Sequence, residues 1–575
     1  MVRWGLVGCL WVLAACGGRG GSGVEPLPVE GRRCPDVRAG PFSQGQSART
    51  PRARGADDAD AGRQAVLLRH QGGAREGAAA VERAGGQVTR RFHHFPWVAA
   101  RLTAEQRARL EAAPEVETLE PDGELRALGS PVRVGAPEEL TEALRMVQAP
   151  QVWDADEDGV LDEGAPTGEG IRVCIIDSGI DPRHPELQVP YVGGHDFVDD
   201  DDDPSDRTGR VWGSGHGTHV AGTLAAQLGS GARTLPGMSP GGVVGVAPGV
   251  ELLIARVLDL DSRARVSTVL AALEWCQRNG ARIVNLSLGG PVIGSAGEEA
   301  FQRAADAGML IVAASGNGRM PGREAPRDFP AAFPSVVAVG AVDGQEELAP
   351  FSNRGPNLDL VAPGVGIVSS IVLGEYKLPV LEAGGRSLPS IAVAFAPEGD
   401  YTGELVDCGE GDSLAACQGG TCDGFVAYVR PGTPEEAGQA VEKVMLQGAR
   451  AVVLGIDASE GEPSLPSLGQ PGFWVPTVAV GPWADDLLRA RLGEPVRVRL
   501  EGVDYVPSSG TSMATPHVAG VAALVWSARP SLTAAQVRAL LETTAKDLGE
   551  PGRDEGYGFG LVQAREALDR LPPQP

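Results

Sequence analysis

Nearly continuous apolar runs alternate with amphipathic stretches through the middle of the chain. The apolar runs are Ile171–Ile176, Leu252–Leu258, Arg282–Leu288, Met309–Ala314 and Val336–Val342. The stretches with helical periodicity are Thr218–Leu228, Ser267–Arg278, Glu298–Ala307, Thr511–Ala528 and Thr533–Thr544. Strands that are apolar along their whole length are typically buried on both faces. The pattern therefore predicts an α/β fold in which a parallel sheet is sandwiched between helices.

A smaller unit with a different order of elements precedes this region. Its expected strands are Ala65–Arg69, Gln87–Phe92, Trp97–Leu102 and Val116–Leu119, and its expected helices are Gly73–Ala84 and a segment that begins at Thr103. Gln106, three residues after Thr103, predicts a capping box at that helix start. The order βαββαβ over residues 63–122 is the split βαβ arrangement, which by itself indicates no function.

A third region, residues 373–506, is rich in expected strands and has one expected helix near Glu435–Gly448. It lies between segments 142–372 and 507–575, which carry the α/β pattern. We interpret it as a β-rich domain inserted into the α/β domain.

The first residues have the features of a secretory signal. Arg3 precedes the apolar stretch Trp4–Leu13, and two alanines and Cys16 follow. This ending resembles a bacterial lipoprotein box, so we expect a signal over residues 1–15, a lipid on Cys16 and a disordered tether over 16–62. An ordinary signal with a chance cysteine is the alternative. We expect a secreted or cell-surface protein that touches a bacterial envelope membrane only through its lipid anchor.

Composition narrows the class of protein further. The chain carries 75 acidic and 50 basic residues, and its net charge of −25 disfavours nucleic acid and anionic membrane surfaces as partners. A hydrophobic content of 42% favours a packed globular protein over a disordered scaffold. No internal run reaches the ~20 apolar residues of a membrane span.

Export would place the cysteines in an oxidising compartment. One disulfide is expected among the cysteines of the third region, with its pairing left open. They are Cys408, Cys417 and Cys422. Cys174 and Cys276 can either pair or remain buried thiols.

Three short motifs place an acid, a base and a nucleophile in a fixed order along the chain. Asp177–Gly179 ends an apolar run, and His216–His219 and Gly510–His517 each open a helical stretch. A carboxylate at the C-terminal end of a parallel strand lies at the edge of the sheet where ligands bind. Taken alone, Asp-Ser-Gly is equally a turn, and His216 with His219 could bind a metal.

Together the motifs resemble the subtilisin family, in which Asp, His and Ser occur in this order. Asn285–Pro291 and Ala314–Gly318 add two matching blocks, and the resemblance covers roughly residues 140–372 and 506–570. It implies a monomeric serine endopeptidase that hydrolyses protein or peptide substrates through an acyl-enzyme. A serine hydroxyl needs an adjacent base to become a good nucleophile.

The resemblance also implies a role for each residue of the site. His216 is the general base, Asp177 orients and stabilises it, and Ser512 is the nucleophile. Asn317 and the backbone N–H of Ser512 would stabilise the oxyanion. The residues expected to line the substrate cleft are Ser287, Leu288, Gly289 and Asp328.

Two other classes of function fit the sequence less well. A binding or adhesion protein on the same fold needs none of Asp177, His216, Ser512 and Asn317, so their joint presence favours the enzyme. An esterase or other α/β hydrolase would have its serine before its histidine, which this chain does not.

Residues 63–122 resemble the subtilisin-type propeptide, which implies an intramolecular inhibitor and self-processing within residues 123–141. A free-standing small domain is the alternative. The insertion at 373–506 resembles a protease-associated domain. It would either steer large substrates or only stabilise the fold.

Two acidic stretches are candidate calcium sites. Asp154, Asp156, Asp158, Val160 and Asp162 match ligand positions of a calcium loop, although Ala165 stands at position 12. The second stretch resembles a calcium-binding loop of some subtilisins and contains Asp196, Asp199, Asp201 and Asp203. A solvated acidic loop is the alternative for each.

Asp328 lies two residues before Pro330, where the resemblance implies the floor of the primary specificity pocket. A carboxylate there would favour Arg or Lys before the scissile bond. The alternatives are a broad apolar preference, with the charge turned to solvent or neutralised by Arg327.

Overall fold

The computed structural model describes residues 62–128, 130–131, 138–206, 215–291, 294–319, 328–413, 417, 424–433, 436–456, 466–469 and 472–572. The expected signal, Cys16 and almost all of the expected tether lie outside these residues. None of the helices in the described part has the length and apolar character needed to span a bilayer.

The N-terminal unit has the predicted order of elements. They are β1 (Arg63–His70), α1 (Ala74–Arg83), β2 (Gln87–Arg91), β3 (Trp97–Thr103), α2 (Ala104–Glu111) and β4 (Val116–Pro121). The strands form a sheet in the order β2-β3-β1-β4, and the pairings of β1 with both its neighbours are antiparallel. Thr103 and Gln106 form the expected capping box at the start of α2.

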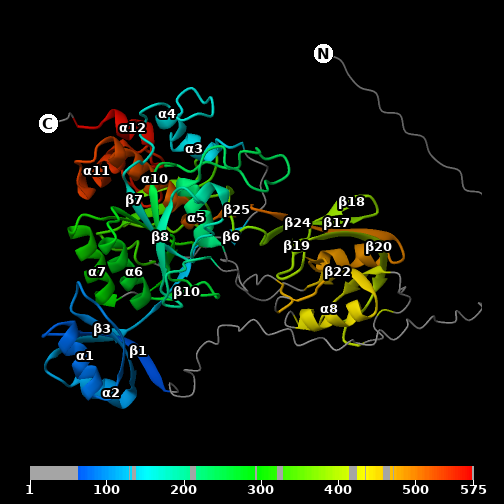
Figure 1. Ribbon diagram of the computed structural model, residues 1–575, viewed down its shortest axis with the longest axis horizontal. Coiled ribbons are helices and arrows are strands. Elements are labelled where there is room, and N and C mark those ends of the chain that lie inside the picture. Colours follow the sequence, from blue (N-terminus) through cyan, green and yellow to red (C-terminus); the bar gives the residue numbers. More distant parts are fainter. Residues whose placement is uncertain are drawn as a thin grey trace, which may run out of the picture. The chain divides into compact units, whose positions relative to one another are not determined.

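Seven of the described strands form the central sheet, and all their pairings are parallel (Figure 1). In sheet order they are β15 (Leu360–Pro363), β14 (Val337–Val342), β13 (Leu310–Ala314), β11 (Ile283–Leu286), β7 (Arg172–Asp177), β9 (Glu251–Arg256) and β8 (Tyr191–Asp196). The parallel α/β prediction is therefore confirmed. The two edge strands, β8 and β15, were not predicted from the sequence. β8 contains two glycines, a histidine and an aspartate, and the apolar run of β15 is only four residues long and ends in proline, so neither gives a clear strand signal.

Helices cover both faces of this sheet, as the apolar runs predicted. On one face, α5 (His216–Ala225) and α10 (Thr511–Ala528) share a buried cluster with Val173 and Ile175 of β7. On the other face, α6 (Val266–Arg278) and α7 (Gly294–Asp306) share a cluster with Ile176. Successive residues of a strand point to opposite faces, so one apolar strand supplies both cores.

A disulfide joins Cys174 of β7 to Cys276 of α6, which decides between the two alternatives left by the sequence. The remaining helices of the α/β domain are α3 (Glu142–Met146), α4 (Pro150–Trp153), α11 (Ala534–Thr544) and α12 (Ala564–Asp569).

The described residues also form two small three-stranded sheets. The first has the order β10-β5-β12 and consists of β10 (Arg263–Arg265), β5 (Glu124–Ala127) and β12 (Leu288–Gly289). The second has the order β16-β25-β6 and consists of β16 (Ile367–Ser370), β25 (Tyr505–Ser509) and β6 (Ser130–Pro131). Each thus pairs a short strand from residues 124–131 with strands of the α/β domain.

The insertion has its own sheet and its own buried cluster, which contains only residues 381–500. The sheet order is β18-β17-β24-β20-β21-β22-β23-β19. Its strands are β17 (Tyr376–Ala383), β18 (Arg386–Leu388), β19 (Ile391–Ala392), β20 (Gly399–Asp407), β21 (Phe425–Val429), β22 (Ala449–Gly455), β23 (Thr477–Val480) and β24 (Pro495–Val503). The expected helix is α8 (Ala437–Leu446), and a short helix that was not expected is α9 (Asp485–Arg489).

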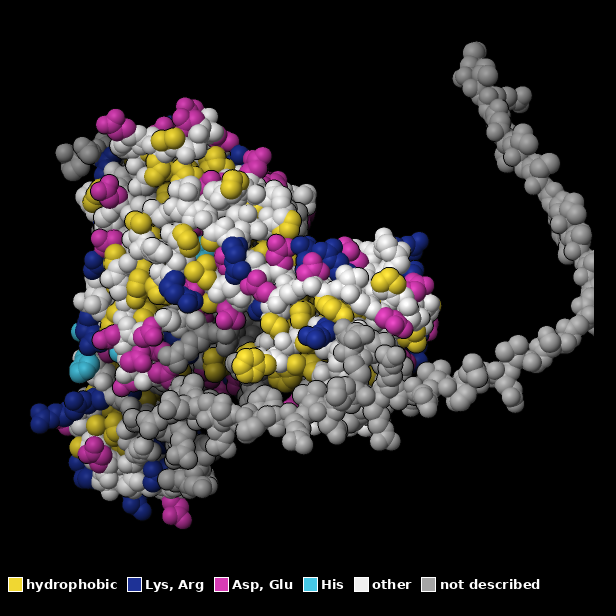
Figure 2. All heavy atoms as spheres, turned by 45° about the vertical axis from the view of Figure 1, so that its right-hand side comes forward, with side chains coloured by type: hydrophobic (Ala, Val, Ile, Leu, Met, Phe, Trp, Pro, Cys, Tyr) yellow, Lys and Arg dark blue, Asp and Glu magenta, His cyan; other side chains and the backbone are white. Residues whose placement is uncertain are grey.

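Cys408 and Cys417 form a disulfide within the insertion, and Cys422 lies outside the described residues. Figure 2 shows groups of hydrophobic side chains on the face of the molecule that it displays. Among the exposed large hydrophobic residues of the insertion are Leu446, Phe473 and Trp483, which are 64%, 93% and 53% exposed.

Candidate active site

Asp177 is the last residue of β7 and is fully buried. Its Oδ1 atom lies 2.7 Å from Nδ1 of His216 and accepts the backbone N–H of Ser178, also at 2.7 Å. A buried carboxylate on Nδ1 fixes the ring so that Nε2 faces away from the acid. The structure thus brings the predicted acid and base into direct contact.

His216 is the first residue of α5, and its neighbours hold the start of this helix in place. Asp206 accepts the backbone N–H groups of Gly215 and Thr218 and the Thr218 hydroxyl, at 3.1, 3.1 and 2.8 Å. The Ser178 hydroxyl accepts the N–H of Gly217 at 2.8 Å. Asp206 was not among the predicted residues, and its contacts join it to residues nine and twelve positions further along the chain.

The pKa of His216 is raised above its ordinary value. Burial is the largest single influence on this pKa and lowers it, but the attraction and hydrogen bond of Asp177, together with the attraction of Asp206, outweigh burial. Among the described residues, Nε2 of His216 has no hydrogen-bond partner. This nitrogen is therefore available to accept a proton.

His219 does not share a metal group with His216 among the described residues. Its Nε2 lies 3.0 Å from the carbonyl oxygens of Ile367 and Val506, and burial lowers its pKa to about 3. The neutral ring of His219 therefore donates to these carbonyls, and the residue has a structural role in the core.

Ser512 is the second residue of α10 and is buried. Its hydroxyl donates to the carbonyl oxygen of Ser287 at 2.8 Å rather than to His216. Its own carbonyl accepts the Ser287 hydroxyl at 2.8 Å. In a regular helix this carbonyl would accept the N–H of residue 516, which is proline and has none. Ser287 therefore replaces the missing helical bond and fixes the turn that carries the nucleophile.

Asn317 follows β13, and its amide group is oriented by Thr511. The Oδ1 atom accepts the backbone N–H of Thr511 at 3.0 Å and the Thr511 hydroxyl at 2.9 Å. Because the Thr511 N–H can only donate, Oδ1 must face it and Nδ2 must point the other way. Thr511 is therefore a positioning residue, and it was not among the residues predicted from the sequence.

Two N–H donors converge on one carbonyl oxygen, that of Leu128. Asn317 Nδ2 lies 2.8 Å from it and the backbone nitrogen of Ser512 lies 3.2 Å from it. These are the two donors that the sequence predicted for the oxyanion. Donors at such distances stabilise negative charge that develops on a carbonyl oxygen.

The predicted cleft residues Ser287, Leu288 and Gly289 hold the same segment. Leu288 and Gly289 pair with Ala127 and Arg126 of β5 in an antiparallel ladder, and the Leu128 N–H donates to the Ser287 carbonyl at 3.3 Å. The structure therefore brings these three residues together with Ser512 and the two predicted oxyanion donors.

Asp328 lies beside Gly289 and Gly316. A Cβ atom at Gly289 would be 3.0 Å from Cδ1 of Leu128 and 3.4 Å from Cβ of Asp328, so both side chains flank this glycine. A Cβ at Gly316 would meet the Asp328 carboxylate at 1.9 Å. Burial raises the pKa of Asp328 to about 6, although the Asn353 amide donates to it at 3.0 Å.

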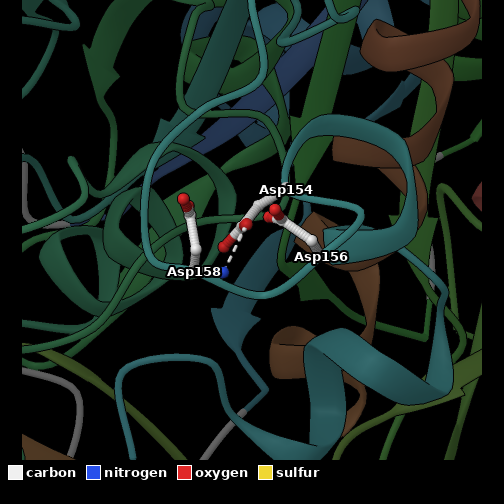
Figure 3. A group of neighbouring side chains, drawn as sticks. All are labelled: Asp154, Asp156 and Asp158. Atoms are coloured by element: carbon white, nitrogen blue, oxygen red, sulfur yellow. Dashed lines mark hydrogen bonds between the residues drawn. The ribbon is translucent and has the colours of Figure 1, made fainter.

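One acidic group has the arrangement of a candidate metal site (Figure 3). Asp154, Asp156 and Asp158 each offer an oxygen, and these oxygens lie within 4.8 Å of one another. Asp154 is fully buried, and burial raises its pKa. Its two oxygens accept the N–H groups of Asp158 and Gly159 at 3.0 and 3.2 Å. Carboxylate oxygens are ligands that calcium prefers.

The other two residues expected in this loop are placed differently. Val160 is 64% exposed, and Asp162 Oδ2 accepts the N–H of Ala155 at 3.0 Å. Asp162 is not part of the group formed by the three aspartates, whereas Val160 would bind through its backbone carbonyl and stays a prediction.

The second acidic stretch does not form such a group among the described residues. Asp196 is fully buried and pairs with Arg256, and Asp199 lies 3.1 Å from the same guanidinium nitrogen. Asp201 is exposed, and its backbone pairs with that of Asp196 across a short turn. The expectation of a calcium site at Asp196, Asp199 and Asp201 is corrected here, because Arg256 supplies the positive charge that a cation would bring.

Comparisons with known proteins agree with this geometry. A family model described as the subtilase family matches residues 168–391 and 494–560. Subtilisin E of Bacillus subtilis (strain 168) is 34% identical over 296 residues, which are 52% of this chain and 69% of that protein. Subtilisin of Bacillus pumilus is 40% identical over 210 residues, which are 36% of this chain and 70% of that one.

A solved structure supports the same fold. Fervidolysin from Fervidobacterium pennivorans, a keratinolytic enzyme related to subtilisin, matches with a TM-score of 0.55 and 22% identity, covering 89% of this chain and 61% of that one. The matched family segments carry all three motifs of the site. The chain belongs to the subtilase family and is a subtilisin-like serine endopeptidase.

Proposed function

We propose that this serine protease is an exported zymogen that processes itself, with Asp177, His216 and Ser512 as its catalytic triad and Asn317 as its oxyanion donor. The observation that carries the proposal is the convergence of Asn317 Nδ2 and the Ser512 N–H on one carbonyl oxygen, at 2.8 and 3.2 Å. The Asp177–His216 pair, 2.7 Å apart, supplies the base.

In the proposed reaction, the Ser512 hydroxyl first leaves the Ser287 carbonyl by rotation about its Cα–Cβ bond. It then donates to Nε2 of His216, which no other described residue engages. As Oγ attacks the substrate carbonyl carbon, His216 takes the proton, and Asp177 stabilises the charged ring. The peptide oxygen becomes an oxyanion between Asn317 Nδ2 and the Ser512 N–H. His216 then protonates the leaving amine, and water hydrolyses the acyl-enzyme.

Docking of the N-terminal unit supports its role as an inhibitory propeptide. The two oxygens of Asp122 accept the N–H and hydroxyl of Ser267 at 2.9 and 2.6 Å, in the first turn of α6. Glu120 in the same way accepts the N–H groups of Ser295 and Ala296 at 3.1 and 2.8 Å, in the first turn of α7. Carboxylates stabilise free N–H groups at helix starts. The unit is thus held against two helices of the protease.

Covalent labelling tests the proposed triad. The mature protein should react with a fluorophosphonate probe, and mass spectrometry should find the adduct on Ser512. Full-length Ser512→Ala, made in a protease-free system, should stay uncleaved and unlabelled. Maturation of that variant at the normal rate would refute self-processing, and labelling at another serine would refute the nucleophile.

We further propose a structural calcium ion at Asp154, Asp156 and Asp158. The buried Asp154 carboxylate and its two neighbours fit a cation because three close carboxylates repel one another without one. A chelator should lower the melting temperature of the wild-type protein by several degrees, as loss of a ligand of the native state does. Asp156→Asn should reduce the chelator effect, whereas Asp201→Asn should leave it unchanged. A melting temperature that a chelator does not move would rule out the site.

Export and lipid attachment at Cys16 complete the proposal and are supported by the sequence alone. The mass of the N-terminal peptide of the precursor isolated from the envelope fraction would test both, since a lipidated Cys16 would be heavier than the free residue. A peptide that begins at another residue would contradict the anchor.

A further inference from the structure

We propose that the chain cuts itself on the carboxyl side of Leu128, at the bond between Leu128 and Gly129. This inference rests on the proposed function, and it identifies the peptide bond that the active site cleaves first. It makes Gly129 the first residue of the mature protease. Four independent features of the structure select this bond.

The carbonyl group is the first feature. The oxygen of Leu128 accepts Asn317 Nδ2 at 2.8 Å and the Ser512 N–H at 3.2 Å. An oxyanion formed at this carbonyl would lie between two donors already in place. The bond broken in such a reaction is the one from the carbonyl carbon to the next nitrogen.

The backbone on the amino side of the bond is the second feature. β5 is the central strand between β10 and β12, with Leu125 opposite Ala264 and Ala127 opposite Leu288. The Leu128 N–H continues the ladder to the Ser287 carbonyl at 3.3 Å. An extended chain held on both sides presents its next carbonyl in a fixed place, as a bound peptide substrate would.

The backbone on the carboxyl side is the third feature. Residues 130 and 131 pair with Ser509 and Ser508 of β25 in an antiparallel ladder. The chain is therefore held both before and after the bond that follows Leu128. Because α10 begins two residues after β25, this second ladder lies directly next to the nucleophile in sequence.

The upstream anchor is the fourth feature, because it sets the register. The Gly123 carbonyl accepts the Val266 N–H at 2.9 Å, and Asp122 caps the same helix start. Leu125 is fully buried in the cluster under α6. A slip by one residue would turn Leu125 out of the core and bring Arg126 into it, so the pairing of β5 is strongly fixed.

The side chain of Leu128 fits its surroundings. It lies against Gly289, where any Cβ would be only 3.0 Å from Leu128 Cδ1. Asp328 flanks the same glycine, and its raised pKa of about 6 describes a carboxyl group in a partly apolar setting. An apolar residue before the scissile bond is thus accepted beside Asp328.

The chemical step balances within the chain and one water molecule. Ser512 Oγ bonds to the Leu128 carbonyl carbon while its proton moves to His216, and that proton then passes to the Gly129 nitrogen as the C–N bond breaks. Water attacks the acyl-enzyme, its proton moves through His216 back to Ser512 Oγ, and Leu128 is left with a free carboxylate.

The experiment follows the first cleavage of the full-length protein in a cell-free, protease-free system. Intact mass of the first released fragment should place its C-terminus at Leu128, and the larger product should begin at Gly129. Leu128→Asp, which puts a second carboxylate beside Asp328, should slow this cleavage at least about tenfold. Arg126→Ala is the matched control, since this exposed side chain lies on the same strand and its loss should change the rate less than about threefold.

The outcomes separate this inference from the proposed function. If the wild-type protein is cut first at another bond while Ser512→Ala is not cut at all, the site is wrong and self-processing stands. If Ser512→Ala is cut at Leu128, an outside activity is responsible and self-processing itself is wrong. Equal cleavage rates for Leu128→Asp and the wild-type protein would also overturn the choice of bond.

Discussion

The N-terminal unit and the inserted β-rich region are both additions to one α/β domain, but they contact it in different ways. The N-terminal unit caps α6 and α7 with Asp122 and Glu120, and its continuation ends with the Leu128 carbonyl on the oxyanion donors. The insertion has a buried cluster made only of its own residues. The N-terminal unit has a buried cluster of its own as well, so the difference is that its continuation reaches the reacting groups.

The way the insertion is attached explains this difference. β16 and β25 are antiparallel neighbours, with Ser370 opposite Tyr505, and the Ile371 N–H donates to the Asp504 carbonyl at 2.9 Å. The insertion is in effect the loop of a β-hairpin. A long loop whose ends already meet can be added or removed at little cost to the strands that carry it.

The largest effect is expected from removing the Asn317 amide, which donates to the Leu128 carbonyl. Asn317→Ala should lower kcat by about 10²–10³, the loss measured on a subtilisin when its oxyanion asparagine is removed. The fall in kcat should exceed any change in KM, because the donor acts in the transition state. Kinetics on one peptide substrate measure both constants.

Thr511 provides a graded control for this variant. Thr511→Val removes one of the two donors that orient Asn317 and should lower kcat by a smaller factor, while Thr511→Ser keeps the hydroxyl and should stay near the wild-type value. An Asn317→Ala enzyme with wild-type kcat would show that this convergence of donors has no catalytic role.

The helix caps give the next largest expected effect. Asp122→Ala should slow self-processing by roughly 2–30-fold, because loss of an N-terminal cap costs about 0.5–2 kcal/mol. Gel analysis of the precursor over time gives the rate. Glu382→Ala, in the insertion, is the matched control, since Glu382 pairs only weakly, at 3.5 Å, with Arg497 of the same sheet. Equal slowing in both variants would remove the contrast between the two regions.

Substrate preference should depend on pH through Asp328. Its pKa is raised to about 6 by burial, so the side chain is neutral well below pH 6 and charged well above it. The ratio of kcat/KM for a peptide with Arg before the scissile bond to that for one with Leu should therefore rise about tenfold as pH increases through 6. Titration of His216 affects both substrates alike and cancels in the ratio.

Asp328→Asn keeps the size of the side chain and removes its titration, so the ratio should become independent of pH. A ratio that still rises through pH 6 in this variant would assign the effect to another group. At every pH, the preference of Asp328→Asn for Leu over Arg should match that of the wild-type enzyme at low pH.

The smallest effect is expected from removing the insertion. Replacing residues 372–503 with an Asn-Gly turn should change kcat/KM for short peptides by less than about threefold, because a two-residue hairpin suits the paired ends at Ile371 and Asp504. A larger loss on whole-protein substrates alone would show that the insertion steers them. Its exposed Leu446, Phe473 and Trp483 are the side chains to test for such a role. A total loss of peptide activity would contradict the hairpin view.

The sequence by itself determined most of the architecture and the identity of the reacting groups. Continuous apolar runs predicted the inner strands, such as β7 and β13, because burial on both faces allows no polar position. The capping box at Thr103 is likewise local, since all its partners lie within four residues. The three motifs predicted Asp177, His216 and Ser512 because their residue types and order are specific.

Only the tertiary structure decided how distant segments meet. Asp196 and Asp199 look like calcium ligands in the sequence, but they lie against Arg256, about sixty residues away along the chain. Leu128 has no feature that marks it, and its carbonyl meets Asn317 and Ser512 only because β5 enters between β10 and β12. Local patterns report what one element buries, whereas these contacts depend on how separate elements pack.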